Sequence, residues 1–271
     1  MVRLKLCLAY LQDLMPQLIP ISRDLHSARA WKRPSSLAFA SSLAIAPLFA
    51  QELAAAALAF PIALTREGGA ANGPFLPVVI LGLEPGQNLF LGPQNQWLGR
   101  YVPMALRYHP FQLARMQDEQ LALCIHEDFI ASAGAGEAFF TEAGEPTEEI
   151  GKILTGLNQM EAGRQTMLQI SAVLDQHGLI EPWPIKVQKE AGLVTVEGLF
   201  RINEAKLKDS APDVLQALMQ ASALPAAYCQ LLSMQHLPTL GQLAQIKEKA
   251  NAPRLPINAA GELDLDSLVQ S

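Results

Sequence analysis

The sequence predicts an α+β protein: a mostly antiparallel β-sheet with helices packed on one face and a helical C-terminal region. Half of the 271 residues are hydrophobic and 17% are charged, which is enough apolar material for a sizeable core and excludes a disordered chain. Short apolar runs separated by turn residues fill much of the first half, whereas longer segments with helical spacing fill much of the second.

The first elements change from helix to strand. Residues Pro47–Phe60 are rich in Ala and Leu and begin with proline, so they predict a helix, while Ser35–Ile45 fits either a strand or a helix. Two apolar runs, Phe60–Leu64 and Phe75–Leu81, flank a Gly-rich connector and predict a β-hairpin. A further strand of the same meander is expected at Leu89–Leu91, after a turn of sequence EPGQN.

The middle of the chain predicts a short helix, a strand and a long helix. Residues Pro103–Met116 suit a helix that breaks near His109-Pro110, and Leu121–His126 suits a strand. An acidic loop then leads to Pro146 and two glutamates, which favour a helix N-terminus because negative charge meets the positive end of the helix dipole. His177-Gly178 is typical of the end of that helix.

The C-terminal part predicts a second hairpin and three helices. Residues Pro184–Val187 and Leu193–Ile202 form the hairpin candidate. The expected helices are Ala211–Ala221, Ala226–Met234 and Thr239–Ala250. We divide the chain into an N-terminal extension or arm (1–19), one domain (20–250, with a helical C-terminal part at 203–250) and a loosely packed tail (251–271).

Charge and composition exclude several classes of protein. A net charge of −6 and a pI of about 5.4 leave no electrostatic footprint for nucleic acid. Cys7, Cys124 and Cys229 have no C-x-x-C spacing, and the five histidines lack the local spacing of metal ligands. Neither a G-x-S-x-G nucleophile motif nor a phosphate-binding loop is present. We therefore expect no metal, no cofactor and no catalytic residue.

The sequence favours a cytoplasmic protein without a transmembrane segment. The apolar run Leu6–Leu11 is too short for a signal peptide, and Met15 is a plausible alternative start that would make residues 1–14 an extension. The Ala-rich stretch Ser35–Leu64 is interrupted by Pro47 and by polar residues, so a buried segment is the better interpretation than a membrane span.

The segment Asn88–Phe111 carries the candidate ligand-binding residues. It combines aromatic rings with planar guanidinium groups, which together stack on or hold polar ligands. Trp97, Arg100, Tyr101 and Arg107 are the candidates from this segment, and Glu52 is the fifth.

Glu52 lies among alanines and leucines, where a charge is costly unless it is paired. Two interpretations remain open. Glu52 pairs with Arg100 or Arg107 beneath the aromatic cluster, or it faces water at one edge of its helix.

Several ordered blocks resemble the bacterial SapC family, from about Pro20 to Leu243. They include SSLAFASSLAIAPLFAQELAAAALAFPIAL, FLPVVILGLEPGQNLFL, WLGRYVPMALRYHPF, LCIHEDF, GEAFFTEAGEPTEEI and GLFRINEAKL. The family's founding member is linked to surface-layer proteins, so the resemblance implies a surface-layer connection and makes the cell surface an alternative location. The resemblance carries no catalytic residues.

Two function hypotheses follow. The first is a non-catalytic SapC-like protein that takes part in surface-layer biogenesis or associates with a protein partner or a small-molecule ligand. The alternative is an enzyme, or an enzyme's accessory subunit, acting on a small molecule or glycan. A deep polar pocket around Trp97, Arg100 and Arg107 would favour the second hypothesis, and a flat apolar patch would favour the first. The oligomeric state does not follow from the sequence.

Overall fold

The computed structural model describes residues 17–116, 120–189 and 192–251, and within them the strands form four separate antiparallel sheets. The largest has five strands in the order β10-β13-β4-β5-β3. These strands are β3 (Ile45–Pro47), β4 (Ile62–Arg66), β5 (Phe75–Ile80), β10 (Ile180–Pro182) and β13 (Phe200–Ile202). Strands β4 and β5 form a hairpin in which Ile62 pairs with Val79, and every residue of β5 is buried.

The smaller sheets lie beyond this centre. One has the order β1-β7-β6, with β1 (Leu18–Pro20), β6 (Phe111–Arg115) and β7 (Leu121–His126). Another has the order β8-β2-β9, with β2 (Arg29–Trp31), β8 (Ile130–Ser132) and β9 (Glu137–Ala138). The last is the two-stranded ribbon of β11 (Ile185–Lys189) and β12 (Gly192–Val196).

The α-helices are α2 (Arg23–His26), α3 (Leu53–Ala57), α4 (Met104–Arg107), α5 (Glu148–Gln176), α6 (Glu204–Lys208), α7 (Pro212–Gln220), α8 (Ala223–Ser233) and α9 (Leu237–Asn251). Single 3₁₀ turns occur at η1 (Ala38–Ala40), η2 (Ala50–Glu52), η3 (Glu67–Gly69), η4 (Glu127–Phe129) and η5 (Met234–His236). Helix α5 begins after Thr147, whose side chain accepts a hydrogen bond from the backbone of Ile150.

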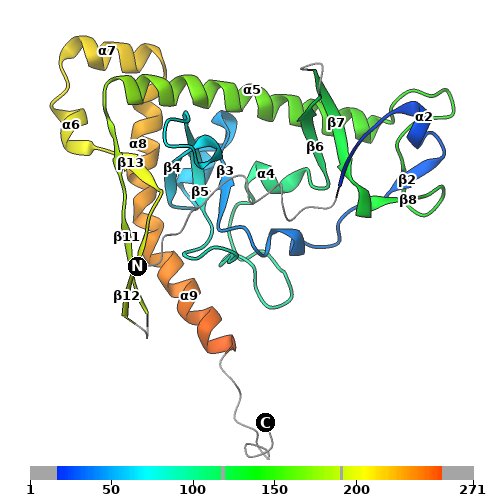
Figure 1. Cartoon of the computed structure of the whole chain (residues 1–271), viewed down its shortest axis with the longest axis horizontal. Coiled ribbons are helices and arrows are strands. Elements are labelled where there is room, and N and C mark those ends of the chain that lie inside the picture. Colours follow the sequence, from blue (N-terminus) through cyan, green and yellow to red (C-terminus); the bar gives the residue numbers. More distant parts are fainter. Residues whose placement is uncertain (1–16, 117–119, 190–191, 252–271) are drawn as a thin grey trace, which may run out of the picture.

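Helix α5 connects the two ends of the molecule (Figure 1). Its N-terminal half packs Ile150, Ile153 and Leu157 against β2, β6 and the chain around Phe139. Its C-terminal half packs Met167, Ile170 and Leu174 against β4, β5, α7 and α8. A third cluster, built on the five-stranded sheet with α3 and the aromatic rings of Phe60 and Phe90, fills the centre. Burial of these apolar faces is the main force that holds the sheets around one helix.

The predicted fold class is confirmed, and most elements are where the sequence placed them. The first predicted hairpin is β4–β5, the strand at 121–126 is β7, and the long helix ends at Gln176. The second is β11–β12, but its predicted strand Leu193–Ile202 is divided, because Phe200–Ile202 is β13 of the five-stranded sheet. The last three helices correspond to α7, α8 and α9. The strands are divided among several sheets instead of forming the single sheet that we expected.

Three predictions were wrong. Leu89–Leu91 is not a strand, and only Leu91 forms an isolated bridge, with Trp97. The predicted helix Pro103–Met116 is helical only over α4, and its second half is strand β6. The predicted helix Pro47–Phe60 shortens to η2 and α3, because Pro47 belongs to β3 and Phe60 to the central core.

Most of the proposed N-terminal arm and C-terminal tail lies outside the described residues, so the proposed division into arm, domain and tail stays a prediction. Residues 1–16, with the alternative start at Met15, and residues 252–271 of the predicted tail lie outside the described residues. Strand β1, at the end of the proposed arm, pairs Leu18 with His126 of β7.

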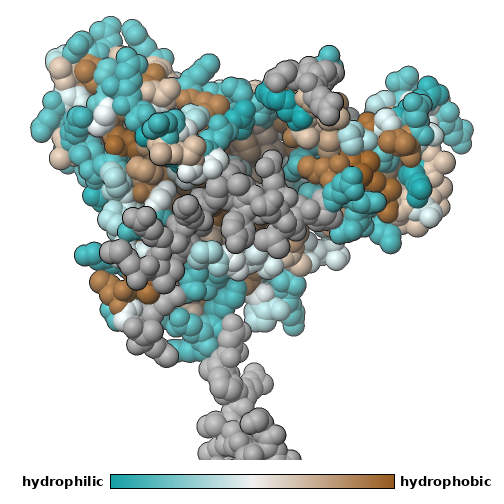
Figure 2. Space-filling model, in the orientation of Figure 1, coloured by the Kyte–Doolittle hydropathy of each residue, from teal (hydrophilic) through white to brown (hydrophobic). Residues whose placement is uncertain are grey.

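No helix of the described part is long and apolar enough to cross a membrane. Figure 2 shows hydrophilic residues over much of the outer rim, and an apolar area near β2, β7 and β8.

Candidate functional site

Three of the predicted ligand-binding residues form a closed structural cluster, which we call the Glu52 cluster: Glu52, Trp97 and Tyr101. Glu52 is 2% exposed. Its Oε2 accepts hydrogen bonds from the Tyr101 hydroxyl (3.0 Å) and from the backbone N–H of Met104 (2.8 Å). Its Oε1 accepts one from the backbone N–H of Phe49 (3.3 Å), at the start of η2. Trp97 Nε1 donates to the Tyr101 carbonyl at 2.7 Å.

Burial, not an arginine, dominates the electrostatics of this cluster. Removal from water raises the pKa of Glu52, and its hydrogen bonds with Met104, Tyr101 and Phe49 offset part of that rise. Burial and the neighbouring Glu52 raise the pKa of Tyr101 to about 12. The cluster joins the 97–104 loop to the start of α3, and both carboxylate oxygens of Glu52 accept hydrogen bonds.

Both interpretations of Glu52 from the sequence were wrong. The carboxylate does not face water, and among the described residues no arginine lies within ion-pair distance of it. Arg107 acts on Glu52 only as a nearby charge. Its guanidinium lies 4.6 Å from the centre of the Tyr101 ring, and its Nε donates to the Val102 carbonyl at 2.8 Å. Arg100 is exposed on the loop before α4.

A cavity of about 590 Å³ lies against β3, α4, β6 and α5, and we call it the histidine cavity. Most of its wall is apolar, from Leu18, Phe39, Leu43, Ile45, Ala46, Pro47, Phe49, Ala105, Leu106, Phe111, Leu157 and Met160. The polar contribution comes from Gln17, Glu67, Tyr108, His109, Gln112 and His126. Trp97 and Arg100 do not belong to this wall.

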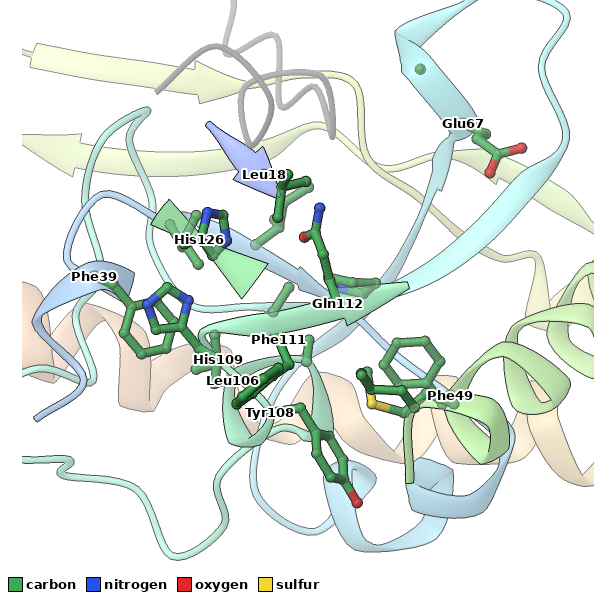
Figure 3. A pocket seen from close by; sticks show the side chains of 18 of the residues that line it. Leu18, Phe39, Phe49, Glu67, Leu106, Tyr108, His109, Phe111, Gln112 and His126 are labelled. Carbon is green, nitrogen blue, oxygen red and sulfur yellow. The ribbon is translucent and has the colours of Figure 1, made fainter. Parts of the chain in front are cut away.

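Two imidazole rings meet at one end of the cavity. His109 lies directly before the cis peptide bond to Pro110, and His126 ends β7; their ring centres are 5.1 Å apart. Phe39 stacks on His109 at 3.7 Å, and Phe129 meets the same ring edge-on at 5.0 Å. In Figure 3 both histidines and Phe39 lie at one end, Phe49 lies at the other, and Gln112 is between them.

His109 has an unsatisfied polar atom. Its Nε2 is buried and has no hydrogen-bond partner among the described residues. Burial, and secondarily the neighbouring His126, lower the pKa of His109 to about 4, so its imidazole is neutral at neutral pH. A neutral imidazole either donates or accepts one hydrogen bond at Nε2, depending on its tautomer. A buried group of this kind is costly unless a partner fills the space in front of it.

The proximity of His109 to His126 follows from the hairpin of β6 and β7, which our sequence analysis did not predict. The β6–β7 hairpin pairs Phe111 with Ile125, and the backbone N–H of His126 donates to the Pro110 carbonyl. The residues just outside Phe111 and Ile125 are therefore neighbours in space. Assigning residues 111–116 to a helix removed the hairpin and with it the proximity of His109 to His126.

The other chemical candidates from the sequence have structural roles in the described residues. Cys124 is buried in β7, and burial raises the pKa of its thiol. The run His126-Glu127-Asp128 is a strand end followed by η4. No group of three or more His, Cys, Asp or Glu side chains that would hold a metal ion occurs in the described part of the chain.

A family model described as SapC matches residues 21–240, which is most of the chain. The chain belongs to the SapC family. Separate comparisons with curated proteins and with solved structures each gave no significant match. The matched range of this SapC protein includes Glu52, His109 and His126, whereas Gln17 and Leu18 of the cavity wall lie just before it.

Proposed function

We propose that this SapC-family protein is a non-catalytic binding protein. Its ligand is a small, mainly apolar molecule with one uncharged hydrogen-bonding group. The observation that carries this proposal is the histidine cavity, in which a neutral, unsatisfied imidazole lies within an apolar wall. A volume of about 590 Å³ is in the range of small-molecule sites, which are typically apolar with a few directed polar groups.

The chemistry of the wall limits the ligand. Apolar side chains from β3, α4, β6 and α5 favour an apolar body by removing its surface from water. At the histidine end the polar group should be uncharged, because His109 stays neutral and offers no countercharge. A hydroxyl, amide, carbonyl or secondary amine satisfies Nε2 in one of its two tautomers.

N-phenyl-1-naphthylamine is a suitable probe, since it has an apolar body, one N–H group and fluorescence that rises in apolar surroundings. For a ligand of this size we expect a Kd on the order of 10 μM by fluorescence titration. Ala105→Phe, which puts a large ring into the cavity wall, should weaken binding at least about tenfold. Ala55→Phe, on the exposed side of α3, is the matched control and should bind like the wild type.

Two results would contradict the proposed function: no binding of the dye to the wild type, or binding to Ala105→Phe that is as tight as binding to Ala55→Phe. Leu43→Trp, from a different part of the wall, serves as a second blocking variant if Ala105→Phe does not fold, and circular dichroism checks each variant.

The SapC name connects such binding to surface-layer biogenesis, and we propose that role with the cytoplasm as the location and the cell surface as the alternative. Cell fractionation with protease shaving of intact cells tests it. Protection from the protease in intact cells is expected. Cleavage at the surface would contradict the cytoplasmic location and support a direct association with the layer.

The enzyme or accessory-subunit alternative is favoured by one observation. An imidazole that is unprotonated at neutral pH and lies beside a second histidine in a cavity wall is free to accept a proton, although a pKa of about 4 makes it a weak base. Mass spectrometry of a ligand purified with the protein separates the two. Recovery of the ligand unchanged after long incubation supports binding, whereas conversion that is lost in His109→Leu supports catalysis.

A further inference from the structure

A second cavity, of about 520 Å³, shares part of its wall with the histidine cavity. Five side chains line both of them: Phe39, Leu106, Tyr108, His109 and Phe111. The two cavities therefore lie against the same residues. A ligand that occupied both cavities would contact these five side chains.

The second cavity differs from the first in charge, because Arg33 and Arg107 both line it. Two carboxylates already neutralise Arg33: Glu137 at 3.1 Å and Glu149 at 2.8 Å. Arg107 has no carboxylate within ion-pair distance among the described residues. It is thus the cation of this wall whose charge is available to a ligand.

Arg107 is held in place by neutral groups. Its Nε donates to the Val102 carbonyl, and its guanidinium stacks on Tyr101, whose hydroxyl is anchored by Glu52. These contacts fix the side chain while its terminal amino groups carry further N–H donors. A guanidinium that is already ordered loses little conformational entropy when it binds an anion.

A second donor in the same wall lacks a partner. Trp31 is 2% exposed and lines the second cavity, and its Nε1–H is buried without a hydrogen-bond partner among the described residues. An indole N–H only donates, so it suits an acceptor such as an anionic oxygen. Arg107 and Trp31, one a charged and the other an uncharged donor, thus both belong to the wall of this cavity.

We propose that the second cavity binds the anionic group of the ligand whose apolar body occupies the histidine cavity. The ligand class is an amphiphilic organic anion, such as a carboxylate, with Arg107 as its charge partner and Trp31 as an added donor. This inference rests on the proposed function and adds to it a ligand charge and a second subsite.

Two matched dyes test the proposal. 8-Anilinonaphthalene-1-sulfonate is N-phenyl-1-naphthylamine with an added sulfonate, so the two differ only in the anionic group. The wild type should bind the sulfonate about tenfold more tightly than the neutral dye, and the two should compete in calorimetric titrations. Arg107→Ala should weaken the sulfonate about tenfold and change the neutral dye less than twofold.

Arg100→Ala is the matched control, since it removes the same charge from another exposed position, in the loop before α4 and outside the cavity wall, and both affinities should stay unchanged. Trp31→Phe should weaken only the sulfonate, by about threefold to tenfold. The inference is overturned if Arg107→Ala leaves the sulfonate affinity unchanged, weakens both dyes equally or matches Arg100→Ala. It is also overturned if the dyes do not compete. A wild type that binds neither dye instead refutes the proposed function.

Discussion

The Glu52 cluster and the histidine cavity both involve residues of α4, but they differ in how their buried polar groups are hydrogen-bonded. In the first, hydrogen-bond donors from the protein reach both carboxylate oxygens, and aromatic rings fill the surrounding space. In the second, the buried Nε2 of His109, a residue of the cavity wall, has no partner among the described residues. The first arrangement stabilises the fold, and the second is the site that we propose for a ligand.

The comparison shows why composition alone misleads here. Trp97 and Tyr101 are the most conspicuous residues of the central segment, but their rings pack against Phe60 and Phe90 in the core. His109 and His126 are inconspicuous in the sequence and become notable only through the hairpin that joins them. Unsatisfied hydrogen-bonding capacity distinguishes the two regions better than aromatic content does.

The largest effect is expected at Glu52. Glu52→Ala should lower the free energy of unfolding by about 3–5 kcal/mol, because it leaves the backbone N–H groups of Phe49 and Met104 and the Tyr101 hydroxyl without their acceptor. Urea unfolding measures this loss. Glu142→Ala, at an exposed glutamate, is the control and should change stability by less than about 0.5 kcal/mol.

Glu52→Gln tests the same hydrogen bonds with a smaller change, because it keeps one acceptor oxygen. The amide keeps one acceptor oxygen for Tyr101 and Met104 but turns an N–H₂ group toward the N–H of Phe49, so we expect a smaller loss of about 1–2 kcal/mol. An unchanged stability in both variants would show that Glu52 does not hold the 97–104 loop.

A smaller effect is expected at His109, and it depends on pH. The pKa of His109 is about 4 in the folded protein and 6.5 in the unfolded chain. As pH falls below 6.5, the unfolded chain takes up the proton first, so stability should fall by about 1–2 kcal/mol between pH 6.5 and 4, after allowance for solvent screening. Above pH 6.5 this contribution is constant. His109→Leu should flatten the profile in urea unfolding.

The two regions should give pH profiles of opposite sign. Burial raises the pKa of Glu52 above 4.5, so the unfolded chain ionises first and the contribution of Glu52 to stability falls as pH rises through 4.5. Glu52→Gln should therefore remove a falling component, and His109→Leu a rising one. If both variants shift the profile in the same direction, the contrast between the regions is wrong.

The fold class could be predicted because the apolar periodicity of helices and strands is visible within short stretches of sequence. The β4–β5 hairpin, β7 and the limits of α5 followed from apolar spacing, turn residues and helix-end signals. The prediction of a helix over Pro103–Met116 was wrong because this segment is a helix before His109-Pro110 and a strand after it. The strand is stabilised by pairing with β7, which its own sequence pattern does not show.

The hydrogen-bond partners of the candidate residues could not be predicted from the sequence, and the reason is different. Glu52 was correctly identified as an unusual charge, but its partners are two backbone N–H groups and a hydroxyl, which leave no charge pattern in the sequence. A cavity is a property of packing among β3, α4, β6 and α5, so residue types alone do not reveal it. Arg107 was selected for its aromatic neighbours, and the structure places it in the wall of the second cavity.

The most direct test of the central claim is NMR of protein with ¹⁵N-labelled histidine during titration with N-phenyl-1-naphthylamine. His109→Leu assigns the ring signals of His109, and His177, which is not part of the cavity wall, serves as an internal reference. We predict that the Nε2 resonance of His109 shifts in proportion to the bound fraction while that of His177 stays constant. Saturated binding with an unchanged His109 resonance would contradict the account.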